Sequence, residues 1–162
     1  VSKMYDAELS VFLRVIVIVV LAGMLGWERQ SAGKSAGLRT HILIGVSSTL
    51  FIAIGQFIAV SFRPYGDHVR FDAAGLIGAV VTGISFLGAG MIIFRSDRQG
   101  VKGLTTAAGI LTTAVIGMLV GLERYLLATG VTLLVLVVLH LLQYIEPVPA
   151  TEPQSEVEGK KT

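Results

Sequence analysis

The sequence predicts an all-α fold, a polytopic membrane bundle of about five transmembrane helices. Composition is the first reason, because 53% of the 162 residues are hydrophobic and only 15% are charged, against roughly a quarter charged in soluble domains. The mean hydropathy of +0.77 is the second reason. The third is that the apolar residues gather in five runs, each close to the ~20 residues that a helix needs to cross ~30 Å of hydrocarbon.

Each apolar run is expected to be a helix, since backbone N–H and C=O groups in lipid must be hydrogen-bonded within their own segment. The short connections predict antiparallel neighbours. We expect a membrane domain over residues 1–145, followed by a disordered, acidic and proline-rich cytoplasmic tail over residues 146–162. The expected spans are Leu9–Trp27, Thr40–Val60, Ala73–Phe94, Leu104–Val120 and Tyr125–Ile145.

Lysine and arginine in the connections predict the orientation, because cytoplasmic loops carry an excess of these residues. The first and third connections, taken with the tail, carry more of them than the opposite side does. This bias predicts an N-terminus outside the cell and a C-terminus in the cytoplasm. The cytoplasmic set is Arg29, Lys34, Arg39, Arg95, Arg98, Lys102, Lys160 and Lys161, and the opposite set is Lys3, Arg14, Arg63, Arg70 and Arg124.

Residue usage argues against several classes of function. Cysteine is absent, which rules out disulfides and thiolate metal sites. The basic residues are scattered singly rather than gathered on one face, so nucleic-acid binding is not indicated. The sequence contains no nucleophile beside a base, no HExxH and no metal-spaced carboxylates. We therefore expect no enzyme activity, no cofactor and no metal site, and we expect the lipid bilayer as a partner.

The stretch GWERQSAGKSAGLRTH, residues 26–41, contains a Gly-Lys-Ser that resembles part of a phosphate-binding P-loop. A P-loop needs GxxxxGK[ST] between a strand and a helix. The position of its first glycine is occupied by Glu28, and a long apolar run precedes it. Nucleotide binding is therefore excluded. The loop's charges favour a docking surface for a partner, while a solvated helix end is the alternative.

Arg14 lies inside the first expected span, where an arginine at the bilayer centre would cost ~2.5 to 3.5 kcal/mol. One explanation is that it snorkels to the nearby interface. The other is an ion pair with Asp72, which begins the third span on the same side. His41, Gln56 and His140 are interpreted as packed or interfacial polar groups.

The third span is crowded with small residues, which permit close backbone approach between membrane helices. It is therefore expected at the centre of the bundle. Its Gly88-Ala89-Gly90 sequence predicts either tight packing or a bend that lines a cavity. In the fourth span, Gly117 and Gly121 form a GxxxG, a weak signal for a homo-oligomer. The small-residue ridges of the third span are Ala74, Gly78 and Thr82, and Gly75, Ala79 and Gly83.

The segment VKGLTTAAG, residues 101–109, leads from the third connection into the fourth span. Thr105 is the expected N-cap of that helix, behind Gly103. An exposed helix N-terminus near Lys102 could also attract an anion. Capping alone is sufficient to explain the sequence.

Three stretches together, GWERQSAGKSAGLRTH, GISFLGAGMI and VKGLTTAAG, with Ile116, Gly117, Gly121 and Tyr125 after them, resemble the N-terminal membrane domain of the MgtC/SapB family. The similarity runs from about Leu9 to Tyr125. It implies a bacterial inner-membrane protein linked to growth under magnesium limitation, to survival in macrophages and to inhibition of the rotary ATP synthase through its membrane sector.

The family's functional stretches map onto three groups of residues in this chain. They are Glu28, Arg29, Lys34, Gly37, Leu38, Arg39 and Thr40; Asp72, Gly83, Phe86, Leu87, Gly88, Ala89 and Gly90; and Gly103, Leu104, Thr105, Thr106, Ala107 and Ala108. Two positions depart from the family pattern: Leu111 replaces a frequent tryptophan, and Glu123 replaces the glycine two residues before Tyr125. The chain resembles the short members that consist of the membrane domain only.

Two functions are compatible with these patterns. One is a regulator that binds other membrane proteins, the ATP synthase membrane sector among them, through small-residue helix faces and the charged loop. The other is a transporter or channel for Mg²⁺ or another cation, with Glu28 and Asp72 as the candidate carboxylates. The predicted topology places these two residues on opposite sides of ~30 Å of hydrocarbon, which favours the regulator.

Overall fold

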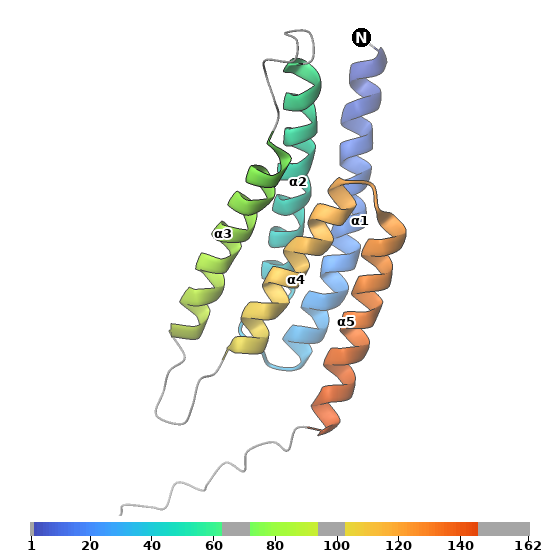
Figure 1. Cartoon of the computed structure of the whole chain (residues 1–162). Helices are drawn as coiled ribbons and strands as arrows, with labels where there is room; N and C mark the ends of the chain where they lie inside the picture. Colours follow the sequence, from blue (N-terminus) through green and yellow to red (C-terminus); the bar gives the residue numbers. More distant parts are fainter. Residues whose placement is uncertain (1, 63–71, 94–102, 146–162) are drawn as a thin grey trace, which may run out of the picture.

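A computed structural model of the chain describes residues 2–62, 72–93 and 103–145. These residues form a bundle of five helices, which confirms the predicted all-α class (Figure 1). The predicted tail over residues 146–162, and the basic residues predicted for the second and third connections, lie outside the described residues. The helices are α1 (Ser2–Ser31), α2 (Leu38–Phe62), α3 (Ala73–Ile93), α4 (Leu104–Gly121) and α5 (Tyr125–Ile145).

Successive helices run in opposite directions, as expected for short connections in a membrane bundle (Figure 1). The helices α1 to α4 are long and apolar enough to cross a membrane. The fifth helix, α5, is apolar and has 21 residues, about 31 Å of helix. Helix α1 is longer than its predicted span because helical hydrogen bonding continues through the polar residues on both sides of the apolar run.

The helix α4 lies at the centre of the bundle and packs against the other four helices. The prediction that the third span would be central is wrong, because among the five described helices α3 packs only against α4 and α2. A Cβ atom added at Gly78, Gly83 or Gly90 of α3 would meet none of the described residues within 4 Å. Most of the small residues of α3 therefore face outward rather than into the bundle.

The closest helix contacts involve glycines of the other helices. A Cβ on Gly117 would lie 2.5 Å from the carbonyl oxygen of Gly45, so α4 and α2 touch through their backbones. A Cβ on Gly26 would lie 2.7 Å from Cα of Leu38, so α1 and α2 do the same. The GxxxG of α4 is thus used for packing against α2 within the chain. It therefore no longer supports a homo-oligomer, which stays a prediction.

An apolar core fills the space between α1, α4 and α5. Ile18 and Leu25 of α1 pack there with Ile116 and Val120 of α4 and Ala128 of α5, all of them buried. Threonines in this interior donate their hydroxyl groups to backbone carbonyls, as Thr113 does to Gly109. The core thus separates polar clusters at the two ends of the bundle.

Candidate functional site

The connection between α1 and α2 is an ordered helix cap. Gly33 has φ 66°, and its N–H donates to the carbonyl of Gln30 at 3.0 Å. The N–H of Lys34 donates to the carbonyl of Arg29, also at 3.0 Å. This pair of bonds is the Schellman motif, in which glycine supplies the left-handed conformation that ends a helix. Gly33 and Lys34 therefore form the C-terminal cap of α1. The Gly-Lys-Ser sequence has this structural role, which agrees with the exclusion of a P-loop.

The same connection begins α2 directly. The side-chain carbonyl of Gln30 accepts the N–H of Leu38 at 3.2 Å. A Cβ on Gly37 would lie 3.0 Å from that side-chain oxygen, so the lack of a side chain there leaves room for Gln30. Two glycines and one glutamine thus hold the loop in a fixed shape.

Glu28 and Arg29 form a buried ion pair at this end of the bundle. Arg29 donates from Nε to Oε2 of Glu28 at 2.5 Å, and from Nη2 to Oε1 at 2.7 Å. The side chains are only 15% and 3% exposed, respectively. Nη1 of Arg29 is buried and has no hydrogen-bond partner among the described residues. A solvated helix end, the alternative interpretation of these two residues, does not fit this burial.

His41 and Thr106 complete a polar group that we call the Arg29 cluster: Glu28, Arg29, His41 and Thr106. His41 is buried, its Nδ1 lies 3.0 Å from the carbonyl oxygen of Gly37, and it packs against α1, where a Cβ on Gly26 would lie 3.0 Å from its own Cβ. Thr106 is also buried. Its depth in the bundle is close to that of Arg29, because α1 and α4 are antiparallel and Arg14 contacts Gly121. Arg29 is 15 residues from Arg14 along α1, and Thr106 is 15 residues from Gly121 along α4.

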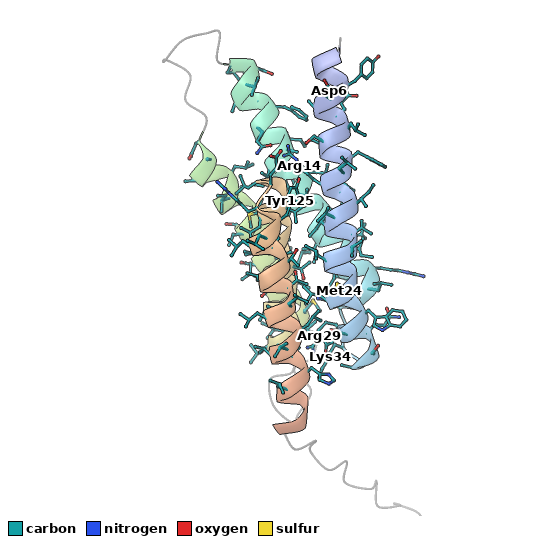
Figure 2. All side chains as sticks on the ribbon, turned by 90° about the vertical axis from the view of Figure 1, so that its right-hand side faces the viewer. Asp6, Arg14, Met24, Arg29, Lys34 and Tyr125 are labelled. Carbon is teal, nitrogen blue, oxygen red and sulfur yellow. The ribbon has the colours of Figure 1, made fainter. Side chains whose placement is uncertain are left out.

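The remaining loop residues of the predicted site lie at the surface of this end. Lys34 and Arg39 are exposed and Thr40 is half-buried. Figure 2 shows Arg29 and Lys34 together at the end of the bundle opposite to Asp6. Buried polar groups and exposed cations therefore share one end, which we call the Lys34 end.

Arg14 belongs to a second polar group at the other end of the described core. It is 7% exposed, and its Nη1 donates to Oε1 of Gln56 at 2.7 Å and to the carbonyl of Gly121 at 2.8 Å. Its Nη2 forms an ion pair with Glu123. We call Arg14, Gln56, Gly121 and Glu123 the Arg14 cluster, and the end with the α4–α5 turn the turn end.

Both predictions for Arg14 are wrong. It does not snorkel, because it is buried, and its acidic partner is Glu123 rather than Asp72. The side chain of Asp72 instead accepts the N–H of Gly75 at 2.8 Å and caps the first turn of α3. Figure 2 shows Arg14 near the start of α5 at Tyr125. The guanidinium of Arg14 also interacts favourably with the negative, C-terminal end of the α4 dipole, because it binds the carbonyl of Gly121.

The sequence contained a signal for Glu123 that the interpretation of Arg14 did not use. Glu123 lies in the short turn between two apolar spans, on the side predicted for Arg14. It has φ 61°, in the left-handed region where glycine is usual. The ion pair with Arg14 accompanies this unfavourable backbone conformation.

The start of α4 also differs from the prediction. The N-cap is Gly103, in the left-handed conformation and without a side-chain cap hydrogen bond, and Thr105 is an exposed residue inside the helix. A Cβ on Gly103 would lie 3.2 Å from the carbonyl oxygen of Met91, so close approach to α3 favours glycine here. Gly88 packs against Ala107, 3.4 Å from an added Cβ, which supports tight packing rather than a bend at that residue.

The structure thus brings together only part of the predicted site. Glu28, Arg29 and Thr106 share the Arg29 cluster, and Lys34, Arg39 and Thr40 lie near it. Asp72 lies at the turn end. On α3, Gly83 is exposed beside the groove with α2 and Gly90 is half-buried. Within residues 2–62, 72–93 and 103–145, no group of three or more His, Asp or Glu side chains is placed to hold a metal ion.

A groove of about 560 Å³ lies between α2 and α3. Its walls are mostly apolar, with Phe51 and Ile44 on α2 and the small residues Ala79 and Gly83 on α3. Ser48 also lines it, with a buried hydroxyl that has no hydrogen-bond partner in the described part of the chain. The groove lies at membrane depth because both helices are candidate spans.

Comparisons with known proteins agree on one family. The sequence profile of the MgtC family matches residues 15–148. "Putative magnesium transporter YhiD" of Escherichia coli K12 is 44% identical over 135 residues, covering 82% of this chain and 61% of that protein. "Protein MgtC" of Salmonella typhimurium LT2 is 34% identical over 125 residues, covering 76% of this chain and 48% of that protein.

A third relative, "Protein SrpB" of Synechococcus elongatus, is 34% identical over 141 residues, covering 79% of this chain and 74% of that protein. No solved structure shows a detectable match. The chain spans about half to three fifths of the length of the YhiD and MgtC relatives. The profile match covers most of the chain and agrees with the multi-pass helical bundle. The chain belongs to the MgtC family.

Proposed function

We propose that this chain is a regulator in the bacterial inner membrane, with an external N-terminus and a cytoplasmic C-terminus, that acts by binding other membrane proteins. The observation that carries the proposal is the exposure of α3. The residues of both small-residue ridges are exposed, and Ala79 and Gly83 of one ridge line the groove with α2. Close helix association in lipid depends on such residues. The groove beside α3 supplies a wall against which a partner helix can pack.

The Lys34 end supports the proposal with charge. Lys34 and Arg39 are exposed next to a loop of fixed shape. Exposed cations on a rigid frame favour one orientation of an acidic partner more than they add affinity. The proposed partner therefore places a helix against α3 and acidic side chains near Lys34.

Magnesium limitation is the proposed condition of action, because the relatives are MgtC proteins and a YhiD protein whose name includes magnesium transporter. The membrane sector of the rotary ATP synthase is the partner to test first, since the family resemblance implies it. Both points are proposals for this chain, which spans only part of those relatives.

Transport of Mg²⁺ is the second candidate, favoured by the name of the Escherichia coli relative. The geometry of the described residues gives it less support. Glu28 is bound to Arg29 at the Lys34 end and Asp72 caps α3 at the turn end. Between them the core is apolar, and Thr49, Thr113 and Thr132 each donate to a backbone carbonyl. Mg²⁺ dehydrates reluctantly, so an apolar interior disfavours its passage.

Co-purification tests the regulator. We expect the chain, extracted gently from membranes of magnesium-starved cells, to bring down an ATP synthase membrane subunit. Gly83→Leu should remove that partner by filling the space beside α3, and Arg39→Ala should weaken its capture at the other contact. Leu134→Ala, an exposed position on α5, is the matched control and should retain it. Purification of the intact chain without any partner under these conditions would refute the proposal.

A further inference from the structure

At the turn end, the polar surface of the bundle gives way to apolar surface at two different levels along the helix axes, one on the α4–α5 side and one on the α1–α2 side. On the α4–α5 side, Glu123 and Arg124 are exposed, and Leu126, just after them, is 91% exposed. A fully exposed leucine in a membrane bundle faces hydrocarbon. The boundary on this side therefore passes between Arg124 and Leu126.

On the α1–α2 side, apolar surface continues beyond that level. Arg14 and Gln56 mark the height of the turn, because Arg14 contacts Gly121 and Glu123. Beyond Arg14, α1 exposes Phe12, Leu9 and Tyr5; beyond Gln56, α2 exposes Phe57, Ile58, Val60 and Phe62. Figure 1 shows both helices extending past the α4–α5 turn.

The size of this step is similar on both helices when α1 is measured to Leu9, its last aliphatic residue before the charged Glu8. Leu9 lies five residues from Arg14, about 8 Å along the helix. Phe62 lies six residues from Gln56, about 9 Å. Two helices that are independent in sequence thus agree on a step of about 8 to 9 Å.

The distance between the two arginine clusters gives the same value. Arg29 lies 15 residues after Arg14 on α1, about 22 Å along the helix. The hydrocarbon of a typical bilayer is ~30 Å thick, so the level of the turn and the level of Arg29 lie about 8 Å closer together than the two faces of that layer.

No boundary at right angles to the helix axes suits both sides of the molecule. A boundary at the turn would leave Leu9 and Phe12 of α1 in water. A boundary at the tips of α1 and α2 would place Glu123 and Arg124 in hydrocarbon, where charged side chains are costly. Either the bilayer therefore changes height around the protein or the bundle tilts within it.

We propose that phospholipid headgroups dip onto the α4–α5 turn, so that one leaflet is locally thinner there by about 8 Å. The turn offers complementary charges to a zwitterionic headgroup. The guanidinium of Arg124 can hold a phosphate through two parallel hydrogen bonds, and the half-exposed carboxylate of Glu123 can attract the headgroup cation. Leu126 below them contacts the acyl chains.

Site-specific quenching in vesicles tests the proposal, and the absence of cysteine from the chain makes labelling simple. A fluorophore is attached to Leu122→Cys in the turn and, in a second protein, to Leu13→Cys on α1. Leu13 is the matched control, since it is 53% exposed and lies next to Arg14 at the height of the turn. Each protein is placed in phosphatidylcholine vesicles doped with nitroxide on the headgroup or at mid-chain.

We expect the headgroup nitroxide to quench position 122 several-fold more than position 13, and the mid-chain nitroxide to do the reverse. Adding Arg124→Leu should reduce the headgroup quenching at 122. Equal headgroup quenching at both positions would mean a flat boundary, and strong mid-chain quenching at both would mean a turn inside hydrocarbon. Quenching of 122 by aqueous iodide alone would mean water without headgroups. Each of these three results would overturn the proposal. Headgroup quenching at 122 that does not change with Arg124→Leu would overturn it as well, because a tilted bundle in a flat bilayer would give that result.

Discussion

Gly117→Ala is expected to lower the free energy of unfolding by about 3 kcal/mol, because the added methyl has no room. Its Cβ would lie 2.5 Å from the carbonyl oxygen of Gly45 and 2.9 Å from Cβ of Ser48. The first of these is backbone, which cannot rotate away, so α2 and α4 must separate. Denaturant unfolding in detergent micelles measures the change.

Gly78→Ala is the matched control for that variant, since it makes the same substitution in another candidate span. A Cβ at Gly78 would meet nothing within 4 Å in the described part of the chain, so the change should be neutral or stabilising by up to about 1 kcal/mol through helix propensity. If Gly117→Ala were as stable as Gly78→Ala, the close contact between α2 and α4 would be wrong.

Glu123→Ala is expected to lower the free energy of unfolding by about 2 kcal/mol. The substitution leaves the buried guanidinium of Arg14 without its carboxylate, which costs ~3 to 5 kcal/mol for a fully buried pair and less for a partly exposed one. Glu123 is 53% exposed in its side chain, which sets the smaller value. Arg124→Ala, an exposed neighbour, should change stability by less than about 0.5 kcal/mol.

A third variant separates the ion pair from the backbone conformation. Glu123→Gly also removes the carboxylate but relieves the left-handed backbone at φ 61°, so it should be about 1 kcal/mol more stable than Glu123→Ala. Equal stability of Glu123→Ala and Arg124→Ala would show that the pair with Arg14 contributes nothing. Equal stability of the alanine and glycine variants would show that the left-handed backbone at residue 123 carries no strain for a residue with a side chain.

Apolar run lengths predicted the helices well, and the starts of α3, α4 and α5 agree with the expected spans. Hydrogen bonding within one segment is a local requirement, which explains that success. The place of α3 was not predictable in this way. Small residues show where a backbone can be approached, but whether a neighbour uses the space depends on the opposite surface. Gly117 meets Gly45, whereas Gly78 meets nothing within the described chain.

The candidate site was predicted in part for the same reason. Glu28 and Arg29 are adjacent in sequence, so their association needed only the helix end on which they lie. The contact of Arg14 with Glu123 joins residues from α1 and the α4–α5 turn, and it depends on how far the turn reaches along α1. That height is set by packing between helices, which the linear pattern of apolar residues does not contain. Asp72 was predicted as the partner of Arg14 only because both residues were expected on the same side of the membrane.

Magnesium flux into proteoliposomes tests the central claim most directly, which is that this bundle regulates partners and does not conduct Mg²⁺. Vesicles containing the purified chain and a magnesium-sensitive dye should fill no faster than vesicles without protein. The Glu28→Gln variant should give the same rate, since Glu28 is engaged by Arg29. Uptake well above the empty vesicles that disappears with Glu28→Gln would contradict the account and identify a transporter.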